Sequence, residues 1–219
     1  MNRSFTKDKT IEHIRGPAGK LEVAIDEPIG EERHAWGIVC HPHPLHGGNM
    51  QNKVVTTLVK TFQYLGLTTI RFNFRGVGRS EGEFAHGIGE LEDLLTVIEW
   101  VQQSNKGKEI WLAGFSFGAY IVAKAATQIS VGQLVTVAPP VQDYSLETLP
   151  SILCPWILIQ GELDDVVSPA AVLSWAESRY PKPLILRFPE AGHFFHGQLI
   201  ELRTQLEQAL LQLQEGHFS

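Results

Sequence analysis

A serine lies between two glycines in the stretch GFSFG, residues 114–118, which follows the apolar run EIWLA and precedes the small-residue run AYIVAKAA. Glycine and serine are common in turns, so an ordinary turn is one interpretation of this stretch. The other is a sharp strand-to-helix corner, where the pattern G-x-S-x-G holds a nucleophile in a strained backbone conformation. The choice for Ser116 depends on whether the chain supplies partners for it.

A nucleophilic serine needs a base, usually a histidine that an aspartate orients, because its hydroxyl is a weak nucleophile at neutral pH. After a G-x-S-x-G corner, the acid and then the histidine are expected in loops that follow later strands. The sequence offers Asp164 after the run WILIQG and His193 after the run LILRF. Asp165 and His196 stand close by as alternatives, but Asp164 and His193 come first after their strands.

The order of apolar runs predicts the elements that must position these residues. Short apolar runs alternate with amphipathic segments, which is typical of a parallel sheet covered on both faces. A turn sequence, GPAG, joins the first two runs and predicts an antiparallel hairpin. The expected strands are 10–14, 20–25, 34–40, 67–74, 109–114, 133–138, 156–161 and 183–188. The expected helices are 52–65, 88–103, 117–128, 169–179 and 195–213.

Length and composition predict one globular domain over residues 1–219, since the chain is 43% hydrophobic and 19% charged. The net charge of −6 without a long basic cluster argues against nucleic acid or an anionic membrane as a partner. Cys40 and Cys154 lie beside apolar runs and are expected to be reduced. With neither a signal peptide nor a long apolar segment in the sequence, we expect a soluble cytoplasmic protein. A homodimer is compatible with these features.

Two loops could suggest a cofactor or a metal, and the sequence favours neither. In RGVGRSEG, a dinucleotide-binding G-x-G-x-x-G pattern would need glycine at position 81, where the chain has Glu81. His41, His43 and His46 cluster in one loop, as metal ligands often do, but no carboxylate accompanies them there. We therefore expect no cofactor and no metal.

Five motifs in order carry a resemblance to a known family. They are CHPHPLHGGNM, RFNFRGVGRSEG, GFSFG, GELDDVVSP and AGHFFHG, each after an expected strand. Over nearly its whole length the chain resembles the α/β-hydrolase superfamily, and in particular its small bacterial members with an HPHP-type loop, which are similar to dienelactone hydrolases and esterases. The resemblance implies a doubly wound, mostly parallel sheet of about eight strands.

The resemblance also implies roles for single residues. Ser116 would be the nucleophile, His193 the general base and then acid, and Asp164 the group that orients the imidazole. The oxyanion hole would combine the backbone N–H of Phe117 with one from the loop 41–49, where the prolines have none to give. His43 and Leu45 are the candidates. Matching the loop to the family by its distance from the end of the preceding strand favours His43.

Other positions bear on the scaffold around the site. Many relatives have aspartate where this chain has Asn73, a departure expected to affect the scaffold more than the chemistry. The resemblance gives Arg75 and Arg79 a structural role, pairing with Glu90 or Asp93 at the start of the next helix. Solvated arginines are the alternative.

The predicted function is hydrolysis of small soluble carboxylic esters or thioesters through an acyl-enzyme. A peptidase or acyltransferase with the same triad, or a non-catalytic binding protein, remains an alternative. Many relatives insert a lid domain between nucleophile and acid, but only residues 139–154 are available here, enough for about one helix and two turns. We therefore expect no full lid and an open cleft.

Overall fold

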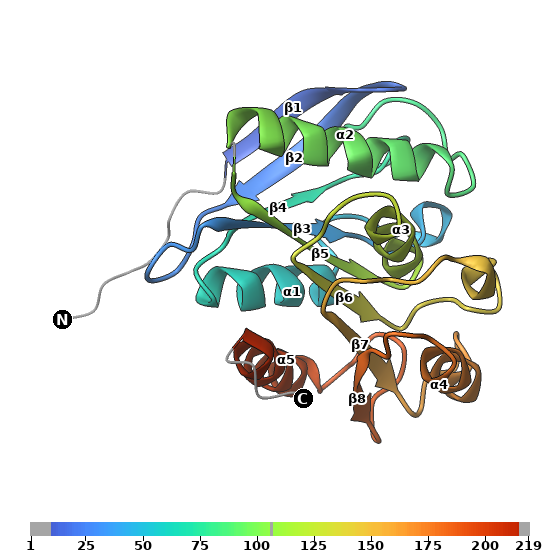
Figure 1. Ribbon diagram of the computed structural model, residues 1–219. Coiled ribbons are helices and arrows are strands. Elements are labelled where there is room, and N and C mark those ends of the chain that lie inside the picture. Colours follow the sequence, from blue (N-terminus) through green and yellow to red (C-terminus); the bar gives the residue numbers. More distant parts are fainter. Residues whose placement is uncertain (1–9, 106, 215–219) are drawn as a thin grey trace.

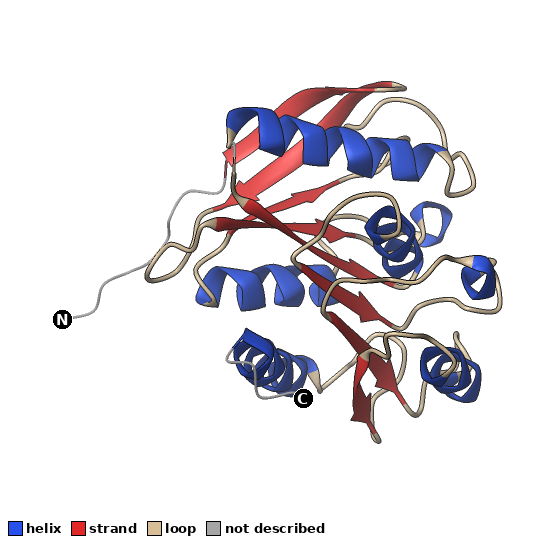
Figure 2. Cartoon of the chain, in the orientation of Figure 1, coloured by secondary structure: helices blue, strands red, loops and turns tan. Residues whose placement is uncertain are grey.

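An eight-stranded sheet forms the centre of the computed structural model, which describes residues 10–105 and 107–214. Its strands are β1 Thr10–Gly16, β2 Gly19–Asp26, β3 Ala35–Cys40, β4 Thr68–Phe72, β5 Glu109–Phe115, β6 Gln133–Val137, β7 Trp156–Gly161 and β8 Leu184–Phe188. Their order across the sheet is β1-β2-β4-β3-β5-β6-β7-β8 (Figures 1 and 2). The pairs β1/β2 and β2/β4 are antiparallel, and every other neighbouring pair is parallel. The predicted sheet and its antiparallel start are confirmed.

Helices cover both faces of the sheet because its central strands are buried on both sides (Figure 1). They are α1 Lys53–Tyr64, α2 Gly89–Ser104, α3 Phe117–Ala126, α4 Pro169–Glu177 and α5 Leu199–Gln214. One apolar core lies under α2, α3 and α4, and a second lies under α1 and α5. Successive strand residues alternate between the two cores. Because the strands from β3 to β8 are parallel, the loops that follow them meet at the same edge of the sheet.

One sequence prediction about helices is wrong in detail. The last helix begins at Leu199 rather than at Phe195, because Phe195 and Gly197 both have positive φ, 52° and 75°, which a helix does not allow. The segment 139–154, where the sequence predicts no regular helix, contains a three-residue 3-10 helix, Leu146–Thr148. Prolines without an N–H stand near both of its ends, which disfavours a longer helix.

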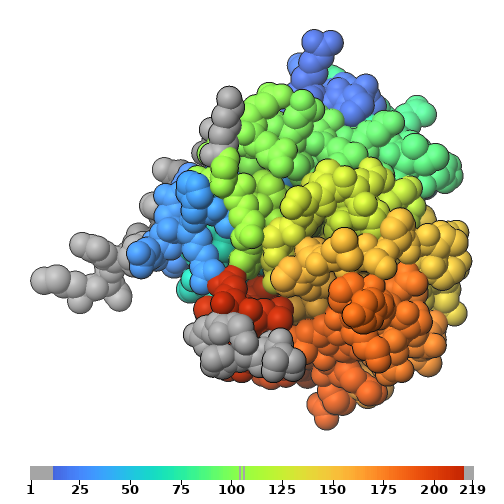
Figure 3. Space-filling model, in the orientation of Figure 1, coloured from blue at the N-terminus to red at the C-terminus, as the bar shows by residue number. Residues whose placement is uncertain are grey.

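The segment 139–154 lies on the body of the protein and does not form a separate domain. Leu146 and Ile152 are buried in the core beneath α3 and α4. The space-filling view shows this golden segment directly against its neighbours (Figure 3). Within the described residues the chain therefore has no lid domain. No helix in that part of the chain is long and apolar enough to cross a membrane.

Candidate active site

Ser116 occupies the corner between β5 and α3. Its φ and ψ are 53° and −118°, a conformation that is uncommon for a residue with a side chain. A Cβ on Gly114 would lie 2.2 Å from the carbonyl oxygen of Gly118, and one on Gly118 would lie 2.4 Å from that of Cys40. Only glycine fits at these two positions, so the stretch is the strained strand-to-helix corner and not an ordinary turn.

His193 follows β8 and faces the serine. Its Nε2 lies 3.1 Å from Ser116 Oγ, and its side chain is only 3% exposed. The imidazole is held between two aromatic rings, with centroid distances of 5.0 Å to both Phe115 and Phe194. His196, the alternative base, is exposed. Of the two histidines, the geometry brings only His193 within hydrogen-bond reach of the serine.

Asp164 follows β7 and contacts the other side of the imidazole. Its Oδ2 lies 2.8 Å from His193 Nδ1. Its Oδ1 accepts backbone N–H groups from Val166 and Val167 at 2.9 and 2.8 Å, so the turn after β7 fixes the carboxylate. Asp165 is exposed. The structure thus shows which of the two neighbouring aspartates contacts His193, a question that the sequence left partly open.

The charge state of Asp164 determines which nitrogen of His193 carries the proton. Burial alone would raise the pKa of Asp164, but the bonds from His193 and from the N–H of Val167 outweigh it and hold the pKa below its usual value. An ionised carboxylate only accepts hydrogen bonds, so His193 must donate through Nδ1–H. In the neutral ring Nε2 then has a lone pair facing Ser116, and this arrangement can accept the hydroxyl proton.

The loop 41–49 presents backbone N–H groups beside the nucleophile. Leu45 N donates to the ring Nδ1 of His43 at 3.2 Å, and the carbonyl of His43 accepts bonds from His46 N and Gly48 N. The N–H groups of His43 and Phe117 have no acceptor among the described residues. The imidazole of His43 lies 5.2 Å from the ring of Phe117. Of the two predicted loop donors, only Leu45 is already engaged.

His41 anchors the start of this loop in the core. Its Nδ1 donates to the carbonyl of Pro42 at 2.6 Å and its Nε2 accepts the N–H of Phe74 at 3.1 Å. Burial lowers the pKa of His41 to about 4, with a further contribution from nearby His43, against the bond to Pro42. The ring is therefore neutral at pH 7. Among the described residues, no group of three or more His, Cys, Asp or Glu side chains could hold a metal.

Arg75 fixes the glycine-rich loop to α2. Its guanidinium contacts the buried carboxylate of Asp93 at 2.8 Å and the exposed one of Glu92 at 3.1 Å, while its backbone N–H also donates to Asp93. Burial raises the pKa of Asp93 even though the bonds from Arg75 oppose this shift. The predicted pairing of Arg75 with Asp93 is confirmed.

The other predicted partners differ from expectation. Glu90 is buried and accepts the backbone N–H groups of Ala85 and Gly87 at 2.8 and 2.7 Å, so it closes the loop instead of pairing with an arginine. A carboxylate accepts hydrogen bonds, and both oxygens of Glu90 are bound by N–H groups of the loop just before α2. Arg79 is exposed, and its backbone N–H donates to Glu22.

Asn73, the departure from the family pattern, joins three segments below the site. Its Oδ1 accepts the N–H of Met50 at 2.8 Å, and its Nδ2 donates to the Glu22 carboxylate at 2.7 Å. An aspartate at position 73 would place two carboxylates together. The amide therefore matches Glu22, and its role is in the scaffold, as the sequence predicts.

Aromatic side chains form one wall beside the proposed donors. The ring of Phe117 is 5.8 Å from Phe84 and 5.5 Å from Tyr144, which stacks on Tyr120 at 4.5 Å. Burial raises the pKa of Tyr144 to about 12, so its hydroxyl stays neutral. Phe84 and Tyr144 are half-buried and come from the loops 75–87 and 139–154. This wall was not predicted, since no spacing in the sequence relates the two loops.

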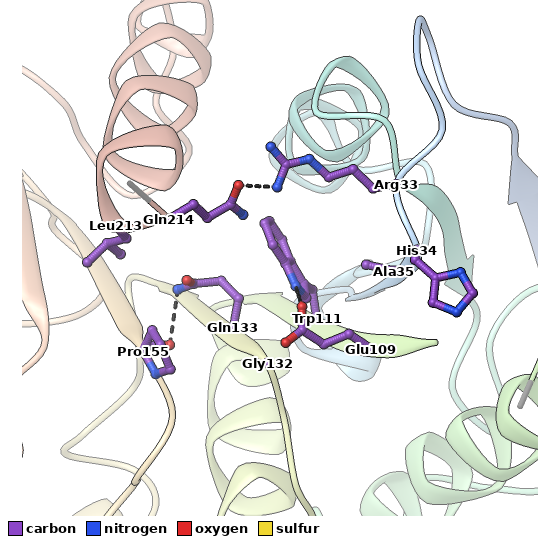
Figure 4. Close-up of a pocket in the computed structure, with 10 residues that line it drawn as sticks. All are labelled: Arg33, His34, Ala35, Glu109, Trp111, Gly132, Gln133, Pro155, Leu213 and Gln214. Atoms are coloured by element: carbon purple, nitrogen blue, oxygen red, sulfur yellow. Dashed lines mark hydrogen bonds between the residues drawn. The ribbon is translucent and has the colours of Figure 1, made fainter. Parts of the chain in front are cut away.

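A separate hollow of about 510 Å³ lies at the opposite edge of the sheet, where the parallel strands begin (Figure 4). Several of its polar side chains are already paired with one another or with the backbone: Arg33 with Gln214, Trp111 Nε1 with Glu109, and Gln133 with a carbonyl. Active-site loops in such sheets follow the carboxyl ends of strands. This hollow is therefore not part of the candidate site.

Sequence reasoning missed one side chain that touches the site. Gln160 in β7 donates from Nε2 to Asp164 Oδ2 at 3.1 Å. The available signal was a single amide within the apolar run WILIQG.

Comparisons with known proteins agree with this fold. The sequence model of a family described as serine aminopeptidase, S33, matches residues 43–151. An uncharacterised protein of Rickettsia prowazekii is 30% identical over 215 residues, with 94% of this chain and 90% of that protein covered.

Solved structures are also similar. An α/β serine hydrolase homologue of Coxiella burnetii is 48% identical with a TM-score of 0.91. The match covers 94% of this chain and 100% of that chain. A serine hydrolase without a lid from Xanthomonas campestris is 40% identical with a TM-score of 0.90, covering 97% and 98%. The chain belongs to the α/β-hydrolase superfamily.

Proposed function

We propose that the chain is a serine hydrolase that cleaves carboxylic esters or thioesters of small substrates through an acyl-enzyme on Ser116. One observation carries the proposal: Ser116 Oγ lies 3.1 Å from His193 Nε2, and His193 Nδ1 lies 2.8 Å from Asp164 Oδ2. This is the nucleophile, base and orienting acid that acyl transfer needs. The lowered pKa of Asp164 keeps the acid ionised, which supports its role in stabilising an imidazolium.

In the first half of the reaction, His193 Nε2 takes the proton of Ser116 as Oγ bonds to the carbonyl carbon. The resulting tetrahedral intermediate collapses when the bond to the leaving oxygen or sulfur breaks, and His193 returns the proton to that atom. In the second half, His193 removes a proton from water, whose oxygen attacks the acyl carbon. The bond to Ser116 then breaks and the proton returns to Oγ.

The oxyanion of each intermediate would accept hydrogen bonds from the N–H groups of Phe117 and His43. Both groups lack an acceptor among the described residues, whereas Leu45 N is occupied by the His43 ring. The Phe117 N–H also begins α3, where the helix dipole favours negative charge. Fixed donors of this kind contribute on the order of 3 kcal/mol each to transition-state stabilisation.

The half-buried aromatic wall of Phe84 and Tyr144 offers an apolar surface for one side of the substrate. A second hollow, of about 360 Å³, adjoins the other side and is lined by Phe194 and His196 together with residues at the start of α1. Hollows of this size match the lower end of small-molecule sites. We therefore place a short acyl group and a small leaving group here, since the described residues form no lid domain that would enclose a longer chain.

Hydrolysis of aminoacyl amides is a second candidate, because the matching family is described as a serine aminopeptidase. One panel tests both reactions: p-nitrophenyl esters, acyl thioesters and aminoacyl p-nitroanilides, assayed with the wild type and with Ser116→Ala. We expect esters or thioesters to give the highest kcat/KM and Ser116→Ala to abolish it. Higher kcat/KM on anilides would replace the ester assignment, and turnover of none of the three would favour a binding protein.

A further inference from the structure

Gln160 is a buried amide in an otherwise apolar strand. Its side chain is fully covered, at 0% exposure, on the face of β7 that carries Trp156 and Leu158 of the larger core. Fully buried glutamines are uncommon, since a polar amide loses its bonds to water when it leaves solvent. The position therefore requires a reason beyond filling space.

The orientation of this amide follows from its neighbours. One terminal atom lies 3.1 Å from Asp164 Oδ2 and 3.0 Å from the carbonyl oxygen of Gly161. Because a carboxylate and a carbonyl only accept hydrogen bonds, the atom between them must be the Nε2 that donates to both. Gln160 is therefore a donor to the same oxygen of Asp164 that accepts from His193.

The oxygen of the amide has no hydrogen-bond partner among the described residues. This atom, Gln160 Oε1, is buried. A buried unsatisfied acceptor destabilises the folded state, and an apolar side chain of similar length, such as methionine, would avoid this cost. Fold stability alone thus does not account for glutamine here, but its donation to Asp164 does.

We propose that Gln160 is a positioning residue that fixes the carboxylate of Asp164 for catalysis; the inference rests on the proposed function. Asp164 Oδ1 is held by Val166 N and Val167 N, and Oδ2 accepts from His193 and Gln160. Without Gln160, Oδ2 is held only by the ring that it must keep in place. The amide makes the position of Oδ2 independent of His193 as the ring gains and loses its proton.

The variant Gln160→Met tests this role, with Gln133→Met as a matched control. Gln133 is another buried amide, 2% exposed, but it donates to backbone carbonyls at the start of β6. Rates are expressed per active site, counted by fluorophosphonate titration, so that misfolded protein does not contribute. We expect Gln160→Met to lower kcat about tenfold, the effect of one hydrogen bond to a charged group. KM should change by less than about twofold, because Gln160 does not touch substrate.

Gln133→Met should leave kcat per active site unchanged whatever it does to the melting temperature. In Gln160→Met the downfield proton resonance of His193 Nδ1–H should move upfield and broaden, because the bond to Asp164 is less well fixed. Unchanged kcat and an unchanged resonance in Gln160→Met would overturn the proposal. If the wild type is neither labelled nor active, the proposed function itself has failed, which is a different result.

A measurement on the wild type decides the question if Gln160→Met does not fold. Modification of Ser116 by a fluorophosphonate stabilises the charged imidazolium of His193. The charge changes the hydrogen bond between His193 and Asp164. The side-chain amide resonances of Gln160 should then shift while those of Gln133 stay in place. Resonances of Gln160 that do not respond to modification would contradict the proposed coupling.

Discussion

Acidification should destabilise the protein through His41, because this ring is fully buried and held neutral. Its Nδ1–H donates to the carbonyl of Pro42, and its Nε2 needs a lone pair to accept the N–H of Phe74. A second proton would therefore break the bond to Phe74 and place a charge in the core. Replacing His41 by glutamine, which does not titrate in this range, should remove the effect.

The magnitude follows from the difference between the folded and unfolded pKa values. Burial lowers the folded pKa of His41 to about 4, while an unfolded histidine titrates near about 6.5. Because the folded pKa is the lower one, the unfolded chain takes up the proton first, and stability falls as pH drops below about 6.5. Between pH 7.5 and pH 5 the loss is about 2 kcal/mol, and it approaches about 3 kcal/mol at pH 4.

Urea unfolding at several pH values between 7.5 and 5 measures this loss directly. The free energy of unfolding of the wild type should fall by about 2 kcal/mol more over this range than that of His41→Gln. An exposed histidine gives the control: His13 lies on β1 at the surface, so His13→Asn should keep the wild-type dependence. Equal pH dependence in the wild type and His41→Gln would refute the reasoning.

Three further predictions concern the site and its scaffold. Asp164→Asn should lose about 10⁴ in kcat, since the acid fixes the tautomer of the base, whereas Asp165→Asn should stay near wild type; steady-state kinetics that reverse this order would reject the assignment. Arg75→Met should cost about 3–5 kcal/mol in urea unfolding because it leaves the charge of Asp93 buried and unpaired, and a loss below about 1 kcal/mol would contradict that pairing. Esters from acetyl to palmitoyl should show kcat/KM highest for short chains and no rise at the micellar concentration; the opposite pattern would mean that another element closes over the site.

The fold and the order of the site residues could be predicted because both depend on local sequence. Apolar runs of strand length reveal the parallel sheet, and the loops after β5, β7 and β8 carry Ser116, Asp164 and His193. The strained corner was predictable for the same reason. Its two glycines lie two residues before and two residues after the serine, and each allows a close backbone contact that a side chain would block.

What the sequence could not supply depends on contacts between distant segments. Three histidines in one loop look alike, yet His41 turns into the core to meet Phe74 while the ring of His46 stacks on that of His43. The bond from Gln160 to Asp164 joins residues only four positions apart, but it depends on how the turn after β7 folds back on its own strand, which the sequence does not show. The spacing of residues along the sequence does not reveal such contacts.

Covalent labelling tests the central claim most directly. A fluorophosphonate probe reacts with a serine only when a neighbouring base has activated it, so it reports the arrangement of Ser116 and His193 and needs no knowledge of the substrate. Intact-mass and peptide mass spectrometry should show one adduct per chain, on the peptide that contains Ser116. The adduct should be absent from Ser116→Ala and formed far more slowly by His193→Ala. A folded wild-type protein that takes up no probe, or takes it up on another serine, would contradict the account.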